Sequence, residues 1–519
     1  MKLSILYHLL KADFLERVRS YRFFVVQMLA VYLGYAAATD KVNLLLDSYR
    51  GVYNSAWVGL LMAMSATLFF SWFGFFVIRG SVQRDYETGV GQIIATTPLN
   101  RLLYALGKTL SNFAILCAMT LVLAVAGVLM VWWVGEGPVE IWLLVSPFLF
   151  IALPPLAVTA AVAVLFETVS WLRGGFGNVV YFLGFGMMMP LFGEAMMGLS
   201  LVVQEVGKIL LPIDPSYQGG IRLGVVVEDE VIKTFVWPGF PWTWEIVGAR
   251  LVYVGVAVGI ALLGAVVFDR FDPARGKVGR VKDEGGGMKK SGNGNPAETR
   301  KEMAGVDVPA RLTALPDGAQ ETSGVQIFIQ QLTAELKLLL KGQKWWWYAG
   351  VAGLLVAQFT APLESVRQLV LPIAWIWPVL VWSGMGNRER QKNTAQMVFS
   401  APHPLRQLGP VWVAGFLLAV LTGAGAGVRL VGDSGFVSWL VGAMFVPSLA
   451  LALGVISGGS RLFEVVYLLF WYLGPVNKVP ALDYVGAVEG SLARAGVYLL
   501  AAVGLGVVAV WGRGRELQN

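Results

Sequence analysis

The sequence contains one cysteine and two histidines among 519 residues. A single cysteine, Cys117, excludes a disulfide framework and a site built from several thiolates. His8 and His403 lie far apart in sequence and give no cluster of metal ligands. No paired carboxylates, Ser/His/Asp set or zinc-ligand spacing is evident. We therefore expect no catalysis, no metal site and no cofactor in this chain, and it is not expected to be an enzyme.

Charge is also scarce. Asp, Glu, Lys and Arg make up 14% of the chain, against roughly 25% in a soluble domain. Hydrophobic residues make up 56%, and the mean hydropathy is +0.65. Many apolar runs reach the roughly 20 residues that a helix needs to cross a bilayer. Because lipid cannot satisfy backbone polar groups, these runs predict an all-α polytopic membrane protein.

Twelve apolar windows divide into two sets of six, separated by a polar segment. They lie at about 23–39, 55–78, 110–134, 141–166, 174–195, 246–268, 345–361, 366–385, 409–430, 436–457, 462–477 and 493–512. Lys and Arg collect in alternate connections, which places both termini in the cytoplasm of a multi-pass protein of the cell (plasma) membrane. The net charge of +7 favours contact with anionic membrane lipids, and no nucleic acid partner is expected.

The chain is expected to contain two parallel six-span repeats. Residues 1–268 form the first unit, with an outer segment at 196–245, and 327–519 form the second. The Gly-rich, charged stretch 269–326 reads as a flexible cytoplasmic linker. An even number of spans gives both units the same orientation. In the outer segment we expect a short helix, followed by either a hairpin or an aromatic anchor.

The segments that precede the first span of each unit resemble one another. ADFLERVRSYRFF at 12–24 aligns with AELKLLLKGQKWW at 334–346, and each follows an apolar stripe at helical spacing. This pattern is typical of an amphipathic elbow helix lying in the membrane interface, at about 3–20 in the first unit. The alternative is the cytoplasmic end of an ordinary span.

Gly107-Lys108-Thr109 looks like the end of a phosphate-binding loop, but Leu102 stands where that motif requires glycine, and no strand precedes it. We expect Lys108 instead to begin the third span and to extend its amine to the membrane surface. The stretch before it, DYETGVGQIIATTPLNR, predicts a short cytoplasmic helix that ends at Pro98. A second stretch, RERQKNTAQMVFSAPHPLR, begins at Arg388 and repeats the plan.

One pattern in this region resembles the permease subunits of ABC-2 type exporters. It consists of a carboxylate, a glycine, an apolar stretch, T-P-x-x-R, and then G-K at the start of the next span. The residues that match are Glu87, Gly89, Thr97, Pro98, Arg101, Gly107 and Lys108. The second copy departs from the pattern, with Gln391, Asn393 and Trp412-Val413 at the corresponding places.

The resemblance implies a fold of two fused permease units, so that a single chain supplies both halves. It implies elbow helices, coupling helices after each second span, and two copies of a separate cytoplasmic ABC ATPase subunit that uses ATP and Mg²⁺. The implied function is export of a small molecule, a lipid or a peptide. The ATPase-coupling residues would be Arg84, Asp85, Glu87, Gly89, Gln92, Thr97, Pro98, Arg101, Arg388, Glu389, Gln391, Gln396, Pro402 and Arg406.

Other charged residues lie near span ends. Glu194 and Arg250 either extend outward or line a substrate path. Arg461 with Glu464, and Glu167 with Arg173, are expected to be interfacial ion pairs. The main alternative function is an ion-gradient-driven secondary transporter with twelve spans. A third class is a polytopic scaffold or a membrane-bound enzyme with no transport activity, which clustered reactive residues would indicate, and none cluster in the sequence.

Overall fold

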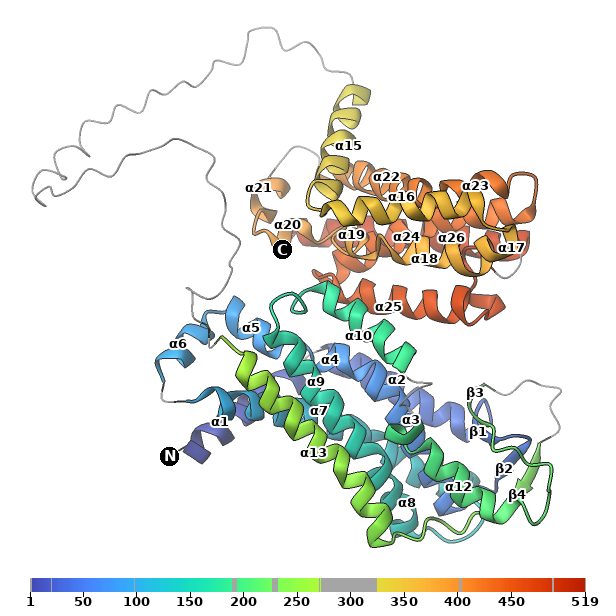
Figure 1. Ribbon diagram of the computed structural model, residues 1–519. Helices are drawn as coiled ribbons and strands as arrows, with labels where there is room; N and C mark the ends of the chain where they lie inside the picture. Colours follow the sequence, from blue (N-terminus) through green and yellow to red (C-terminus); the bar gives the residue numbers. More distant parts are fainter. Residues whose placement is uncertain are drawn as a thin grey trace, which may run out of the picture. The chain divides into compact units, whose positions relative to one another are not determined.

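The computed structural model describes residues 2–19, 21–97, 99–188, 194–225, 232–269, 271, 324–400, 404–487 and 490–518 (Figure 1). Most of the expected linker 269–326 lies outside the described residues. The chain divides into two compact units. The first contains residues 1–272 and 459–477, and the second contains residues 273–458 and 478–519. A segment of the C-terminal half thus belongs to the first unit.

The first unit is mainly helical. Its helices are α1 (Lys2–Val18), α2 (Tyr21–Ala38), α3 (Ser55–Trp72), α4 (Gly74–Ile78), α5 (Ser81–Glu87), α6 (Val90–Thr96), α7 (Arg101–Val134), α8 (Ile141–Pro147), the π-helical turn η1 (Phe148–Ala152), α9 (Leu153–Thr168), α10 (Gly175–Met188), α11 (Glu194–Met197), α12 (Leu199–Leu210), α13 (Trp244–Val267), α25 (Arg461–Trp471) and η5 (Tyr472–Val476).

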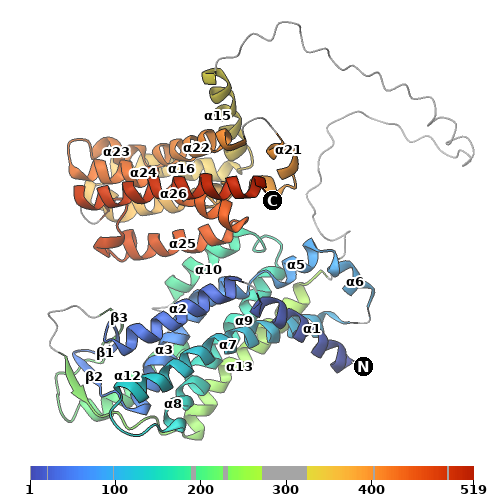
Figure 2. The same ribbon diagram turned by 180° about the vertical axis from the view of Figure 1, so that it is seen from behind.

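A small four-stranded sheet lies at the end of the first unit away from α5 and α6 (Figures 1 and 2). Its strands are β1 (Val42–Leu46), β2 (Tyr49–Gly51), β3 (Ile221–Val225) and β4 (Lys233–Phe235), in the order β3-β1-β2-β4. β1 pairs with β3 in antiparallel fashion, and β2 pairs with β4 in parallel. The outer segment therefore contains the expected short helix, α12. Its two strands, β3 and β4, pair with β1 and β2 and not with each other, which the hairpin interpretation did not anticipate.

The second unit is also helical. It contains α15 (Gly324–Leu340), α16 (Trp345–Thr360), α17 (Leu363–Ser365), η3 (Val366–Val370), α18 (Leu371–Ile376), α19 (Val379–Trp382), α20 (Arg388–Gln391), α21 (Ala395–Phe399), η4 (Pro404–Gln407), α22 (Leu408–Thr422), α23 (Ala424–Arg429), α24 (Ser434–Ser457), η6 (Pro480–Leu482) and α26 (Leu492–Gln518).

Eight helical stretches of the described chain are long and apolar enough to cross a membrane. They are Ser55–Trp72, Arg101–Val134, Ile141–Thr168, Trp244–Val267, Leu363–Trp382, Pro404–Thr422, Ser434–Ser457 and Leu492–Gln518. The prediction of an all-α polytopic membrane protein is confirmed at this level. Four helices at the remaining predicted spans are not among these eight: α2, α10, α16 and α25.

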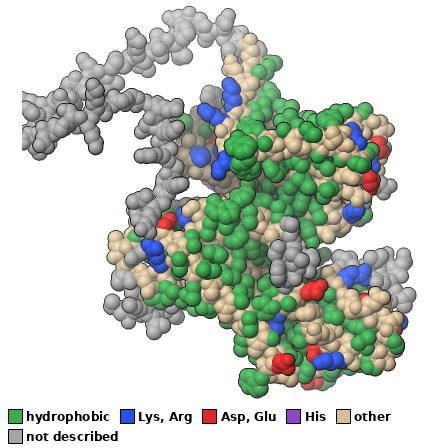
Figure 3. Space-filling model, viewed as in Figure 1, with side chains coloured by type: hydrophobic (Ala, Val, Ile, Leu, Met, Phe, Trp, Pro, Cys, Tyr) green, Lys and Arg blue, Asp and Glu red, His purple; other side chains and the backbone are tan. Residues whose placement is uncertain are grey.

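The apolar helices differ in what covers them. In the most apolar part of α3, 78% of the residues are buried inside the protein. In the most apolar part of α13, only 17% are buried. Residues such as Val266 and Leu263 of α13 are exposed, as expected where lipid replaces protein contacts. Figure 3 shows apolar side chains over much of the visible helical surface. The helices therefore hold α3 in the middle of the first unit and leave α13 at its edge.

Candidate functional site

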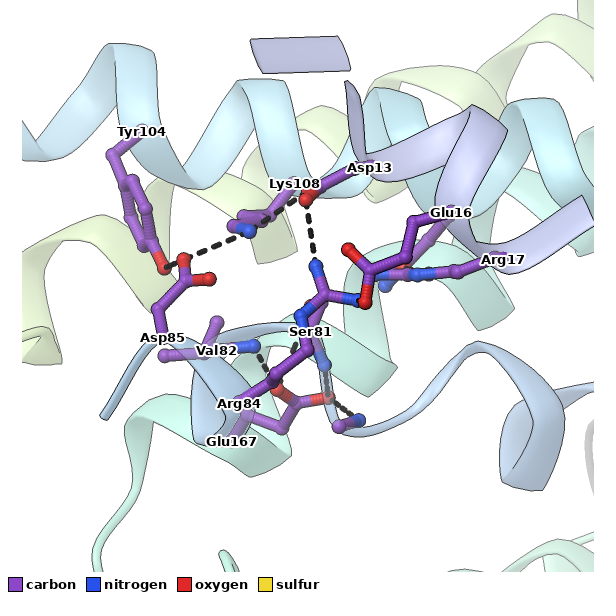
Figure 4. A network of polar contacts seen from close by, with 12 residues as sticks. Asp13, Glu16, Arg17, Ser81, Val82, Arg84, Asp85, Tyr104, Lys108 and Glu167 are labelled. Atoms are coloured by element: carbon purple, nitrogen blue, oxygen red, sulfur yellow. Dashed lines mark hydrogen bonds and ion pairs between the residues drawn. The ribbon is translucent and has the colours of Figure 1, made fainter. Parts of the chain in front are cut away.

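A network of charged side chains surrounds α5 at one end of the first unit (Figure 4). It begins on α1, where Asp13, Glu16 and Arg17 occupy positions i, i+3 and i+4, so that they share one helix face. α1 packs along α7, and this contact brings Asp13 close to Lys108. The elements that meet here are therefore the expected elbow helix, the expected third span and the short helix between spans two and three.

Lys108 lies at the centre of the network. Its side chain is 1% exposed, and its amine is 2.8 Å from Asp13 Oδ2 and 2.8 Å from Asp85 Oδ2. Tyr104, one helical turn earlier on α7, donates its hydroxyl to Asp85 Oδ2 at 2.6 Å. Burying an amine without a partner costs several kcal/mol, so the two carboxylates stabilise Lys108 in this position. The expectation that Lys108 extends to the membrane surface is wrong, because ion pairs inside the protein hold it.

Arg84 of α5 extends the network to a second acid of α1. Its guanidinium is 2.8 Å from Asp13 Oδ1 and 2.7 Å from Glu16 Oε1. Asp13 thus accepts from Arg84 through one oxygen and from Lys108 through the other. Arg17 extends past them and donates to the carbonyl of Ile78 and to Asn112. Burial lowers the pKa of Arg17. One carboxylate therefore connects α1, α5 and α7.

Glu167, at the end of α9, caps the N-terminus of α5. Its carboxylate accepts hydrogen bonds from the backbone N–H groups of Gly80, Ser81, Val82 and Gln83. These are the first N–H groups of a helix, which have no partner within the helix and carry a partial positive charge. The expected side-chain ion pair with Arg173 is not the arrangement found, since Arg173 Nε donates to the backbone carbonyl of Glu167. The carboxylate instead fixes where α5 begins.

The C-terminal part of α5 contacts the segment after α13. Tyr86 donates its hydroxyl to Asp269, and the guanidinium of Arg173 lies 4.3 Å from the centre of its ring. Burial, together with the hydrogen bond to Asp269, raises the pKa of Tyr86. Phe271 packs on the same ring and on Tyr104. Side chains from α1, α7, α9 and the segment after α13 therefore hold α5 in place.

The second unit has ion pairs at the corresponding short helix. Arg388 of α20 pairs with Glu335 of α15 at 2.8 Å, and these residues align with Arg84 and Asp13. Glu389, which aligns with Asp85, lies 3.5 Å from the guanidinium of Arg513 of α26. Arg513 is 3% exposed, and it also lies over the ring of Phe399. The aligned carboxylates thus receive their cation from different helices, Lys108 of α7 in one unit and Arg513 of α26 in the other.

The predicted coupling residues fall into anchored and exposed groups. Arg84, Asp85, Arg388 and Glu389 are anchored by the ion pairs described above. Gly89 connects α5 to α6 with a φ of +74°, a left-handed conformation that glycine adopts readily, so the single expected helix is in fact two. Thr97 donates its hydroxyl to the carbonyl of Ile94 at 2.7 Å, which helps to end α6.

The exposed group lies around α6 and α21. Ile93 is 66% exposed and Met397 is 72% exposed. The predicted residues Gln92, Gln391, Gln396 and Arg406 are also exposed, while Arg101 is half-buried at the start of α7. The predicted Pro98 and Pro402 lie outside the described residues, as does the side chain of Glu87.

The two weaker candidates lie elsewhere in the first unit. Glu194 is exposed at the start of α11. Arg250 does not extend outward as one interpretation required, because it is 4% exposed. Its guanidinium donates to the backbone carbonyls of Phe150, Ile151, Ala195 and Met196. Phe150 and Ile151 belong to the π-helical turn η1, where regular helical bonding is interrupted. Arg250 therefore joins α13 to the π-helical turn η1 and to α11.

Sequence reasoning missed Asp13, Tyr104 and Glu167 as members of the network and assigned Lys108 a different role. The sequence contained only weak signals for two of them. Asp13 is an acid on a mostly apolar helix and is matched by Glu335 in the second unit, and Glu167 is an acid at the end of an apolar span. Among the residues that the structure describes, no group of three or more His, Cys, Asp or Glu could hold a metal ion. No protein-family model, curated protein or solved structure matches this chain.

Proposed function

We propose that this chain is the permease of an ATP-driven exporter of the ABC-2 type, built from two fused six-span units. It moves a small-molecule, lipid or peptide substrate across the cell membrane with energy from a separate ATPase. The observation that carries this proposal is the anchoring of α5. Buried charges from α1, α7 and α9 hold this short helix, while the adjoining α6 leaves Ile93 exposed.

An exposed apolar residue on a firmly anchored short helix is suited to receive a partner protein. Isolated apolar side chains are common on protein surfaces, so the proposal rests on exposure and anchoring together. What strengthens the proposal is the second copy, in which α21 exposes Met397 beside a helix anchored by the Arg388–Glu335 pair. Two docking positions in one chain agree with two copies of an ATPase subunit.

The mechanism follows from the rigidity of the anchor. Closure of the ATPase dimer on ATP and Mg²⁺ would push on α5–α6 and on α20–α21. Because Asp13 and Lys108 connect α5 to both α1 and α7, the displacement would pass to these helices as a rigid-body movement. Repacking of the spans would then open a path to the other side. In this proposal both termini and the short helices face the cytoplasm.

The rival is a secondary transporter driven by an ion gradient. Such proteins use ionisable groups inside the membrane domain. Lys108, buried between two carboxylates, is a group of that kind. Its place at the end of α7 next to α5 favours a structural link, because the bilayer midplane is where transporters bind their coupling ions.

The test is to purify the tagged chain from its native host in mild detergent and to identify stoichiometric companions by mass spectrometry. We expect an ATPase subunit at two copies per chain, together with ATP hydrolysis that depends on the chain. Absence of any ATPase under several gentle conditions, with transport abolished by an ionophore, would establish the rival and overturn the proposal.

A further inference from the structure

α25 belongs to the first compact unit, although the chain connects both of its ends to the second. It follows α24, which ends at Ser457, and it leads through η5 toward η6 at Pro480. Within the first unit it packs against α10. A helix of the C-terminal half therefore forms part of the first unit.

The contact between α10 and α25 joins equivalent positions of the two halves. Asn178 precedes Val179-Val180-Tyr181, and Glu464 precedes the identical Val465-Val466-Tyr467. Asn178 donates a hydrogen bond through Nδ2 to Glu464 Oε2, and the glutamate is 1% exposed. Contact between equivalent positions is what a two-fold arrangement of like elements produces near its axis. α10 and α25 are therefore equivalent helices of the two halves that contact each other at equivalent residues.

Arg461, at the start of α25, contacts the junction that precedes α5. Its Nη1 donates to the backbone carbonyl of Arg79 at 3.2 Å, and its Nη2 donates to Gln83 Oε1 at 2.8 Å. The expected ion pair between Arg461 and Glu464 is therefore wrong: the two side chains have different partners. Arg461 instead contacts the first turn of α5.

Gly80 makes this close approach possible. Its φ of +105° is in the left-handed region, and a Cβ atom added there would lie 2.3 Å from Arg461 Nη1. On the other side of the junction, the guanidinium of Arg79 donates to Asn178 Oδ1 and to the backbone carbonyls of Leu172 and Gly174. Burial lowers the pKa of Arg79 to about 10, so it remains charged at neutral pH.

The junction between α4 and α5, formed by Arg79 and Gly80 with the first turn of α5, is thus held by side chains from three helices. Glu167 holds it from α9, Asn178 holds it from α10 through Arg79, and Arg461 holds it from α25. The first two belong to the N-terminal half. Of these three residues, only Arg461 comes from the C-terminal half. Its guanidinium donates both of the hydrogen bonds that connect α25 to the junction.

We propose that Arg461 is a positioning residue that makes α5 and α25 move as one body, so that the first docking helix acts directly on a helix of the C-terminal half. This inference rests on the proposed function for the source of the movement. It extends that function by giving the first ATPase position a connection into both halves of the chain. The connection itself exists with or without an ATPase, and this allows the two ideas to be tested separately.

The experiment measures one distance by pulsed electron paramagnetic resonance. Spin labels are placed at Thr88→Cys, after α5, and at Leu462→Cys on α25, in the full-length Cys117→Ser chain, because both positions are exposed. In the chain alone we expect a single narrow distance distribution. Arg461→Gln should broaden it. Gly80→Ala, which keeps every charge but places a methyl group where the guanidinium lies, should broaden it as well.

Arg515→Gln serves as the matched control, because Arg515 lies over Trp511 of its own helix, α26, which belongs to the second unit. It should leave the distribution unchanged. An equally narrow distribution in Arg461→Gln and Gly80→Ala would overturn the proposal. In the complex with the ATPase, ATP should leave the wild-type distance unchanged, and a shift would also overturn it. Failure to find an ATPase defeats the proposed function, while the measurement on the chain alone still decides the role of Arg461.

Discussion

Lys108 of α7 and Asp13 of α1 form an ion pair at 2.8 Å, and both side chains are buried. The pair joins the helix expected to lie in the membrane interface to the longest helix of the described chain. Asp13 also pairs with Arg84, so the same carboxylate reaches the short helix α5. A displacement of α5 therefore cannot leave α1 and α7 unaffected without breaking buried charge pairs.

Replacing Lys108 by methionine should strongly destabilise the first unit. The substitution keeps most of the length of the side chain but leaves Asp13 and Asp85 buried without their shared cation. Removing one partner of a buried pair costs about 3–5 kcal/mol. Thermal unfolding of the purified protein, followed by loss of the monodisperse species, should show a lower midpoint for Lys108→Met. The control is Lys341→Met, an exposed lysine, and an equal midpoint in the two variants would contradict the buried pairing.

Replacing Glu167 by glutamine should loosen the first turn of α5 without unfolding the protein. The neutral amide accepts fewer and weaker hydrogen bonds from the N–H groups of Val82 and Gln83. Loss of a helix cap costs about 0.5–2 kcal/mol. Hydrogen exchange followed by mass spectrometry should show faster exchange in a peptide covering residues 81–87. Glu194→Gln, at an exposed position of α11, should leave that peptide unchanged; unchanged exchange in Glu167→Gln would argue against the cap.

Placing a charge on α6 should prevent the ATPase from binding. Ile93 is 66% exposed, and Ile93→Asp introduces a carboxylate into the surface that the proposal assigns to the partner. Ile213, between α12 and β3, has the same residue type and the same 66% exposure, so Ile213→Asp is a matched control. We expect the ATPase to be lost from the first variant and retained by the second when the tagged chain is purified. Equal recovery of the ATPase would contradict the docking assignment.

The sequence predicts the helices well, because a bilayer leaves an apolar run few alternatives to a helix. The window at 141–166 corresponds to the continuous stretch Ile141–Thr168. The π-helical turn at Phe148–Ala152 was not predicted, since it depends on the local contacts of Arg250 and on Pro147. The membership of α25 in the first unit was also missed. Hydropathy reports that a segment is apolar, but it does not report which other segment will cover it.

The candidate site was predicted in part. Arg84 and Asp85 were identified because they repeat at Arg388 and Glu389. Their partners were not identified, because a lysine near the end of a span satisfies the same sequence pattern whether it reaches the surface or pairs inside the protein. Only the packing of α1 on α7 brings Asp13 to Lys108 and excludes the first alternative. Pairing between residues distant in sequence is the information that a single sequence does not contain.

The small sheet should respond to acid through Asp214. Its carboxylate accepts from the Ser216 hydroxyl at 2.6 Å and from the Tyr49 hydroxyl at 2.9 Å, and these hydrogen bonds hold the pKa of Asp214 well below its usual range. A lowered pKa in the folded state means that this stabilisation is present above the unfolded value, about 3.9, and is lost as the pH falls through the folded value.

Hydrogen exchange at residues 49–51, corrected for the intrinsic effect of pH, should therefore show strong protection at pH 6 that weakens toward the acid limit. Asp214→Asn should be less protected at pH 6 and should change less with pH. A wild-type protein whose protection does not depend on pH, or a variant that follows the wild-type curve, would show that Asp214 does not hold the sheet in this way.

The aligned ion pairs of the two units should differ in strength. Arg84–Asp13 and Arg388–Glu335 both have a distance of 2.8 Å. The Asp13 side chain is 9% exposed and also binds Lys108, whereas the Glu335 side chain is 23% exposed. Partly exposed pairs contribute about 0.2–1 kcal/mol, and a pair with a buried, shared carboxylate should contribute more.

Double-mutant cycles measure the two coupling energies directly. One cycle combines Arg84→Gln with Asp13→Asn, and the other combines Arg388→Gln with Glu335→Gln, with the free energy of unfolding as the readout. We expect a larger coupling energy in the first cycle, because water screens and replaces the partner of the more exposed Glu335 more readily than that of the buried Asp13. Equal coupling in both cycles would mean that burial of Asp13 does not strengthen its pair with Arg84, and the two short helices would then be anchored to the same degree.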